Sequence, residues 1–246
     1  MKNWLLAVGL FLTVYSFFLV KTLPMSVVLG FVSLPNKLLL SEVSGTVWQA
    51  KFGNVQYDKV QLSNVTIDIS AWSLLTLNPE VDVQFGDQLS VGPEGKLTLT
   101  DLLSQLKVTD AELFVAADQI AQQLPLPIPL SASGQVTVML ESFMLGEPIC
   151  SQVQGKIQWP NSGVKAFNQT IVLGDFSADL ACEEGVLALT LAPENNLGLT
   201  FSAYVRPTGV SGTGYLLPGT GFPSQLTSAL PFLGKPDRQG RYRLSF

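Results

Sequence analysis

The chain has 246 residues and a formal net charge of −5, from 14 basic and 19 acidic side chains. A negative chain lacks the basic footprint on which nucleic-acid binding depends. The absence of any histidine excludes Ser-His-Asp catalysis, Cys-His catalysis and zinc-dependent hydrolysis. Only 13% of the residues are charged, whereas 47% are hydrophobic. This composition is typical of a membrane-resident protein, or of a sheet protein with uncharged polar residues on its wet face.

The N-terminal segment is an apolar run from Trp4 to Val20, flanked by Lys2 and Lys21. Its length of roughly 17 residues reaches the lower limit for a helix that spans a bilayer. No small-x-small cleavage pattern follows it, so the run predicts a retained transmembrane signal anchor. The positive-inside rule places its start in the cytoplasm. A cleaved signal peptide and a buried core helix are the two alternatives.

After this run, apolar and polar residues alternate with a period of two, which predicts antiparallel strands with one apolar and one hydroxyl-rich face. The clearest alternating segments are residues 65–70, 96–100, 134–140 and 197–205. An apolar sheet face can close against a second sheet as a sandwich or stay open as a groove, and both fit the pattern. The predicted fold is therefore mostly β. It combines one transmembrane helix with an antiparallel sandwich-like or open-groove β domain and a few short helices.

Helical patterns are short and occur at residues 70–77, 116–124 and 222–234. Between the strands, Pro125, Pro127 and Pro129 occupy alternate positions. Their missing N–H groups would all fall on one side of an extended segment, which predicts an edge strand or a linker. This segment divides the β domain into two halves, at about residues 40–124 and about residues 130–246.

Two ten-residue segments, 41–50 and 151–160, share a serine at the first position, a valine at the third and a glycine at the fifth, with a tryptophan soon after. The shared residues include no acid and no strong nucleophile. Glycine adopts positive φ at little cost, so it often marks a bulge or an entry turn at the start of a strand. The repeat therefore predicts a recurring strand entry, which is scaffold and not a site. The glycines that precede alternating segments are Gly45, Gly95, Gly134, Gly155 and Gly212.

Cys150 and Cys182 are the two cysteines of the chain. In an oxidising compartment a lone pair of cysteines usually bonds, so an exported chain predicts a disulfide between them. Two unrelated buried thiols are the alternative. The spacing matches no metal site and no redox C-x-x-C motif.

The sequence shows no motif of an enzyme active site, and no catalytic, cofactor-binding or metal-binding residue is predicted. It contains neither a P-loop nor a G-x-G-x-x-G dinucleotide motif. Glu80 and Asp82 alternate with Val81 and Val83. This alternation places the two carboxylates on the wet face of a strand, and not in a site for acid–base chemistry or calcium.

Taken in order along the chain, these features resemble the type II secretion system protein N family, also called general secretion pathway protein N, of Gram-negative bacteria. The N-terminal anchor and the cysteine pair are two of the shared features. A third is the strand pair with its Ser-Gly-x-Val-Trp motif at residues 38–62, and a fourth is a strand-to-helix passage with Trp and Leu at residues 69–87. The last two are the alternating prolines at residues 124–138 and the Arg-rich ending at residues 233–246.

The resemblance implies a single-pass protein of the bacterial inner membrane with a periplasmic domain. On this basis residues 1–3 are a cytoplasmic stub, residues 4–21 the transmembrane signal anchor and residues 22–246 the periplasmic β domain. The anchor from Trp4 to Val20 and the disulfide from Cys150 to Cys182 carry over from the family; no catalytic residue does. The short cytoplasmic stub argues against contact with the cytoplasmic ATPase.

The implied function is non-enzymatic and needs no cofactor. Members of the family look like accessory parts of the machine that moves folded proteins from the periplasm across the outer membrane. The expected partners are other secretion components in the inner membrane or periplasm, with the outer-membrane secretin as one candidate.

The anchor and the glycine-started strands also resemble the AsmA-like proteins of bacteria, whose repeated strands form an open groove with a lipid-lined interior. On this alternative, the β domain binds or transfers lipid in the periplasm. A third class, an anchored hydrolase, is disfavoured by the missing histidine and the missing motifs.

Overall fold

The computed structural model describes the chain except for residues 1, 33, 59, 71–72, 74–77, 88–91, 103, 124–130, 167–168 and 246. The chain forms two compact units, Met1–Glu94 and Gly95–Phe246, called unit 1 and unit 2 below. The segment of the three alternating prolines lies outside the described residues. The edge strand or linker expected there, and the two halves expected on either side of it, stay predictions.

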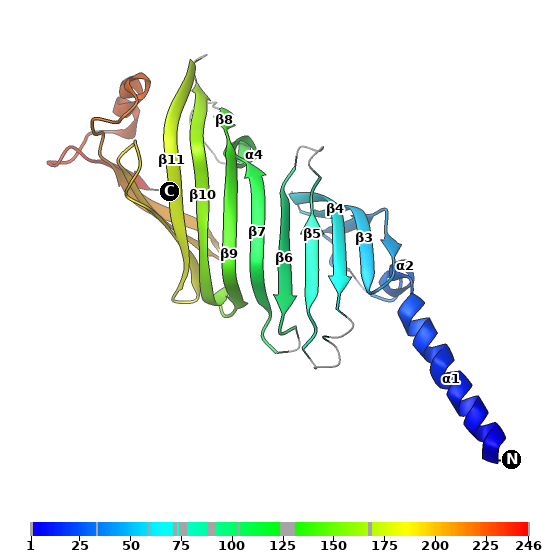
Figure 1. Cartoon of the computed structure of the whole chain (residues 1–246). Helices are drawn as coiled ribbons and strands as arrows, with labels where there is room; N and C mark the ends of the chain where they lie inside the picture. The colour runs from blue at the N-terminus through cyan, green and yellow to red at the C-terminus, as the bar shows by residue number, and fades with distance from the viewer. Residues whose placement is uncertain are drawn as a thin grey trace. The chain divides into compact units, whose positions relative to one another are not determined.

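Unit 1 begins with α1, a helix of 21 residues over Lys2–Thr22 that is coloured blue in Figure 1. Most of its large apolar side chains are exposed; Trp4, for example, is 70% exposed. Counting only the described residues, no helix has both the length and the apolar character that a membrane crossing requires. The helix predicted over Trp4–Val20 is present, because α1 covers all of these residues. The prediction that it is transmembrane is not supported, because the helix falls short of that requirement.

The C-terminal end of α1 is fastened to the chain that follows it. The indole N–H of Trp48 donates a hydrogen bond of 2.9 Å to the carbonyl oxygen of Val20. A backbone hydrogen bond and a single antiparallel bridge join residues 23–24 to residues 46–47. The last carbonyls of a helix have no partner within the helix, so the Trp48 bond satisfies one of them.

The strands of unit 1 pair antiparallel in the order β1-β3-β4-β5, and β2 pairs with β3. Their bounds are β1 (Leu38–Ser41), β2 (Ser44–Gly45), β3 (Gln49–Tyr57), β4 (Val60–Ile69) and β5 (Val81–Phe85). The core of the unit consists of Ala50, Phe52 and Val65, and the short helix α2 (Met25–Leu29) packs against it with its first and last side chains. Phe52 and Val65 face each other across β3 and β4.

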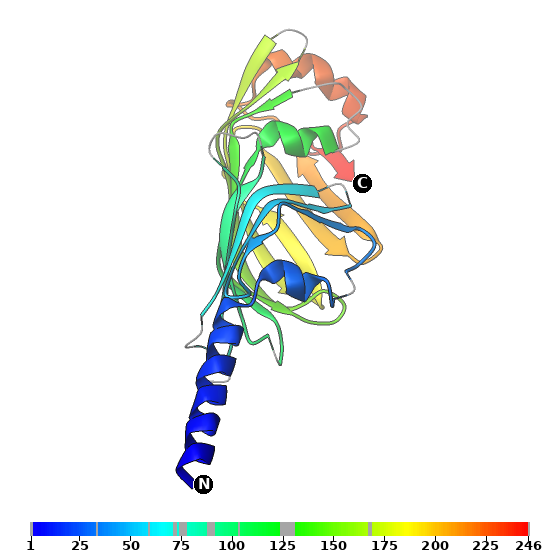
Figure 2. The same cartoon turned by 90° about the vertical axis from the view of Figure 1, so that its right-hand side faces the viewer.

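The strands of unit 2 form one antiparallel sheet in the order β6-β7-β9-β10-β11-β12-β13-β14-β15, with β8 paired to β10. The bounds are β6 (Glu94–Thr100), β7 (Lys107–Ala116), β8 (Ser131–Ser133), β9 (Gln135–Leu145), β10 (Cys150–Ala166), β11 (Gln169–Glu183), β12 (Val186–Leu191), β13 (Leu199–Arg206), β14 (Gly209–Leu216) and β15 (Tyr242–Ser245). Figure 2 shows that this sheet curves strongly from its green strands to its yellow and orange strands. The prediction of a mostly antiparallel β fold is confirmed.

The short helices are found where the described residues allow a comparison. The pattern at residues 116–124 forms α4 (Ala117–Gln123), and the pattern at residues 222–234 forms the 3₁₀ helix η1 (Ser224–Leu233). The third pattern, at residues 70–77, lies mostly outside the described residues.

The repeated glycine has a different role in each of its two segments. Gly134 precedes β9 with φ +97°, as expected of a glycine at a strand entry. Gly45, with φ +84°, instead ends β2 and leads into the turn before β3. Gly155 instead lies within β10, where an added Cβ would come within 2.6 Å of the Met139 carbonyl oxygen on β9. The prediction of a strand start is wrong for Gly155, because this glycine allows close approach of a neighbouring backbone. Gly95 and Gly212 also lie inside strands.

The two repeated tryptophans have matching structural roles. The indole of Trp48 bonds to the Val20 carbonyl, and the indole of Trp159 bonds to the Ser133 carbonyl at 3.0 Å. Each side chain therefore ties one strand region to a backbone segment elsewhere in its own unit. Trp159 also packs against the ring of Phe176, with 5.9 Å between ring centroids. These contacts fit a scaffold and not a ligand platform.

The first prediction concerns Gly45. An added Cβ would clash with the Gln49 carbonyl oxygen, and φ is already +84°, so Gly45→Ala should lower the free energy of unfolding of unit 1 by about 1–3 kcal/mol. Gly92→Ala is the matched control in the same unit, since no atom lies within 4 Å of its added Cβ. Urea unfolding followed by circular dichroism measures both variants. Equal losses in the two would contradict the prediction.

Candidate functional site

The antiparallel register of unit 2 sorts its side chains into an apolar face and a polar face. From β7 to β14, one row of paired positions consists of Ala111, Leu140, Gly155, Leu180, Leu189, Ala203 and Gly212. The neighbouring row, from β7 to β15, consists of Glu112, Met139, Lys156, Asp179, Thr190, Ser202, Thr213 and Ser245. Successive side chains on a strand point to opposite faces. The first row therefore marks the apolar face, and the second marks the polar face.

The apolar face is only partly withdrawn from water. Cys150, Val153 and Leu180 are buried at its centre, whereas Leu140 and Leu189, which pack against them, are half-buried. All described strands of unit 2 belong to one sheet, so they do not form a sandwich of two separate sheets. The apolar face is thus a surface on which an apolar ligand or partner can be accommodated.

The structure brings the two cysteines together. Cys150 opens β10 and Cys182 lies near the end of β11, and their Sγ atoms form a disulfide with a Cα–Cα distance of 6.1 Å. Cys150 is 1% exposed and belongs to the core of the apolar face. The disulfide therefore joins a buried position of β10 to a half-buried position of β11.

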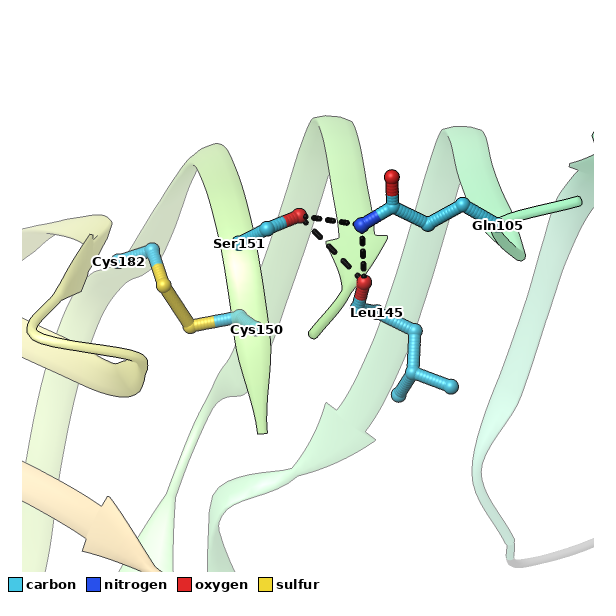
Figure 3. Close-up of a disulfide and its surroundings, with 5 residues drawn as sticks. All are labelled: Gln105, Leu145, Cys150, Ser151 and Cys182. Atoms are coloured by element: carbon cyan, nitrogen blue, oxygen red, sulfur yellow. Dashed lines mark hydrogen bonds between the residues drawn. A yellow bond between two sulfur atoms is a disulfide. The ribbon is translucent and has the colours of Figure 1, made fainter. Parts of the chain in front are cut away.

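Hydrogen bonds surround the disulfide, as Figure 3 shows. The Gln105 side-chain amide donates to the Leu145 carbonyl at 2.7 Å and to the Ser151 hydroxyl oxygen at 2.9 Å. The amides of Ile149 and Cys150 both donate to the Gly185 carbonyl. These bonds join the segment before β7, the β9–β10 connection and the β11–β12 turn. The end of the sheet that holds the disulfide is thereby fixed in three places.

The two residues predicted to bound the anchor lie at opposite ends of α1. Trp4 is highly exposed and Val20 is 55% exposed, and the carbonyl oxygen of Val20 accepts the Trp48 bond. The side chains of α1 offer apolar surface and no group for chemistry.

The sequence placed two carboxylates, Glu80 and Asp82, on the wet face of a strand; this is confirmed for Asp82, whereas Glu80 lies just before β5. Asp82 is exposed on β5 between buried Val81 and half-buried Val83. The pKa of Tyr204 is raised because its hydroxyl donates a hydrogen bond to the Glu183 carboxylate and because the negative charge of Glu183 disfavours ionisation of the tyrosine. Within the part of the chain that the structure describes, no three cysteine or carboxylate side chains are placed to hold a metal ion.

Sequence reasoning missed a polar pocket over β13, β14 and β15. Thr200, Ser202, Thr213, Tyr215 and Arg243 contribute to its lining. The alternation of hydroxyl-bearing residues in residues 200–215 and the ending with Arg241 and Arg243 were its signals. Only the pairing of β13 with β14 and of β14 with β15 shows that these residues are neighbours.

The family model of type II secretion system (T2SS) protein N matches residues 36–245, which include strands of both units. The chain belongs to this family. The resemblance that the sequence predicted is confirmed.

Relatives named type II secretion system protein N support the same assignment. The one from Aeromonas hydrophila is 32% identical over 100% of this chain and 98% of its own length. The one from Vibrio cholerae is 31% identical over 95% of this chain and 93% of its own, and the one from Pectobacterium carotovorum is 25% identical over 98% and 92%. No solved structure matches the chain.

The second prediction concerns the disulfide. The double variant Cys150→Ala, Cys182→Ala should lower the free energy of unfolding by about 3–4 kcal/mol, because the cross-link restricts the unfolded chain. The sheet should still form, since its register does not depend on the bond. Urea unfolding of oxidised wild type and variant gives the difference, and alkylation with mass analysis verifies the bond. Two freely alkylated thiols in native exported protein would refute it.

Proposed function

We propose that this chain is a non-enzymatic accessory component of the type II secretion system, held at the bacterial inner membrane with its β units in the periplasm. In this role it binds other secretion components and supports the export of folded proteins across the outer membrane. The observation that carries the proposal is the family match over residues 36–245, together with relatives that bear the same name along nearly their whole length.

The disulfide supports the periplasmic location. Cys150 and Cys182 are bonded, and disulfides persist in the bacterial periplasm but are rare in the cytoplasm. Both cysteines lie in unit 2, so this support applies to that unit directly. Unit 1 continues the same chain and shares the family match.

The helix α1 supports attachment to a membrane. Its exposed leucine, valine and phenylalanine side chains would be costly to leave in water, because apolar area gains free energy when it leaves water. In the sequence, Lys2 and Lys21 flank the apolar run, and lysines at the ends of an apolar segment typically reach lipid headgroups.

Among the residues that the structure describes, the β units offer surface for binding and no group of three side chains that could hold a metal ion. Strands at the ends of a sheet can add a partner's strand through their backbone groups. The expected partners are secretion components of the inner membrane or periplasm, and the secretin is one of them.

The third prediction tests the secretion role. Deleting the gene should leave exoproteins in the periplasm and lower the fraction found in the medium, because an accessory part of the export machine is then missing. Immunoblots of medium, periplasm and membranes measure this, and the full chain on a plasmid should restore export. The restored protein should remain in carbonate-washed membranes. Normal secretion in the deletion strain would contradict the proposal.

One observation favours a second candidate function, which is lipid binding. The half-buried apolar face of unit 2, with Leu140 and Leu189 beside its core, resembles a surface that acyl chains can cover. On this alternative the protein holds or transfers lipid in the periplasm.

The fourth prediction separates the two candidates. If acyl chains occupy the apolar face, phospholipid should co-purify with the full chain in a non-phospholipid detergent and be identified by mass spectrometry. Leu189→Gln should lower this lipid because it places an amide on the apolar face. Thr190→Gln, one position along on the polar face, should leave it unchanged. If both variants co-purify the same amount of phospholipid, the lipid is bound outside the apolar face, for example on the exposed apolar side chains of α1, and the lipid-binding candidate is contradicted.

A further inference from the structure

The polar pocket of unit 2 is built from three adjacent strands. It has a volume of about 300 Å³, and Thr200, Ser202 and Thr213 are among its lining residues. The register places Thr200, Tyr215 and Arg243 side by side on β13, β14 and β15. The pocket therefore gathers hydroxyl-bearing residues and one arginine.

The positive charge at this pocket belongs mainly to Arg243. Arg241 lies against the Tyr215 ring, 4.6 Å from its centroid, but it also forms a salt bridge of 2.8 Å with Asp237. The backbone N–H of Arg241 holds the pKa of Asp237 below its usual range, so Asp237 stays ionised as the pH falls and continues to neutralise Arg241. Among the described residues, no ion pair involves Arg243.

The charge of this segment is opposite to that of the rest of the chain. Residues 235–246 contain four basic residues and one acidic residue, a net charge of +3. The remaining residues contain 10 basic and 18 acidic residues, a net charge of −8. An anionic ligand is therefore attracted to the pocket and repelled by most of the remaining surface.

The pocket adjoins a sheet edge. β15 is the last strand in the order of unit 2 and pairs with β14 along one side. No described strand pairs with its other side. Positive charges on an edge strand prevent two copies of that edge from pairing with each other, yet the same charges favour an acidic strand.

We propose that β15 and the adjacent pocket bind an acidic, extended segment of a partner protein. The segment adds as a strand along the side of β15 that pairs with no described strand, and one of its carboxylate side chains lies beside Arg243 at the β15 end of the pocket. There Arg243 donates charge-assisted hydrogen bonds to the carboxylate.

Two features together select a peptide over other anions. A phosphate ion or a lipid headgroup could use the guanidinium and the hydroxyls, but only a peptide backbone can also satisfy the N–H and C=O groups of an edge strand. The inference deepens the proposed binding role by naming the chemistry of the partner, and it rests on that role for the partner's place in secretion. The binding itself can be measured without any secretion assay.

The fifth prediction uses a short fluorescein-labelled peptide of alternating glutamate and valine as the probe. We expect it to bind the purified full chain in uncharged detergent, with affinity that falls as salt rises. Arg243→Gln should weaken binding about tenfold, since it removes a charge-assisted hydrogen bond. Arg238→Gln removes the same charge from the same segment outside the pocket lining, and it should change the affinity about twofold or less. Fluorescence anisotropy measures all three proteins.

A second measurement tests the strand addition. Backbone amides of β15 should exchange more slowly with deuterium when the peptide is bound. Arg243→Lys should restore part of the affinity, and circular dichroism should show that every variant is folded. The proposal is overturned if Arg238→Gln weakens binding as much as Arg243→Gln, if a glutamine-valine peptide binds equally well, or if β15 gains no protection.

Competition identifies the source of the anion. Inorganic phosphate or phosphatidylglycerol vesicles that displace the peptide at equal charge concentration would show a general anion site and would also overturn the proposal. A failed peptide assay with defective secretion in the deletion strain would leave the secretion role standing without this site. Normal secretion in the deletion strain with Arg243-dependent peptide binding would leave the peptide site standing without the secretion role.

Discussion

The register between neighbouring strands of unit 2 is the constraint on which both faces of its sheet depend. The pairings Leu140 to Gly155, Gly155 to Leu180 and Leu180 to Leu189 keep small and apolar positions in line across four strands. A slip of one residue in any pair would turn a whole strand over and place acids and hydroxyls among the apolar side chains. Gly155 is central to this arrangement, because a side chain there would collide with the backbone of β9. The close contact between β9 and β10 thus requires a glycine.

The pairing of β9 with β10 contains a register shift, and this shift helps to keep the apolar side chains on one face. Gln154 pairs with Ser142, but the next residue, Gly155, pairs with Leu140, so Glu141 is left over on β9. A bulge of this kind adds one residue to one strand and bends it. Because of it, Leu140 and Phe143 can both pack against the core around Cys150 although three positions separate them. The disulfide then closes the side of this core that faces β11.

Much of this arrangement can be predicted from the sequence, because strand alternation is local. The segments around Val65 and Val138, the short helix at Ala117 and the pairing of the two cysteines follow from period, composition and export. The roles of Gly155 and Arg243 do not. A glycine at a close backbone approach has the same sequence signal as a glycine at a turn, and pocket residues on three strands become neighbours only through the register. The apolar run of α1 predicted a helix correctly, whereas no helix among the described residues meets the length and hydropathy that a membrane span requires.

The joint after α1 has a mechanical consequence. The Trp48 indole bond, the backbone bond and the bridge tie the end of α1 and residues 23–24 directly to residues 46–48, which precede β3. A tether of flexible residues would let the unit sample many heights and tilts, whereas this short connection gives it a fixed offset from the helix end. Whatever surface holds α1 therefore also sets the orientation of unit 1. A force on the helix passes directly into β3, because Trp48 immediately precedes that strand.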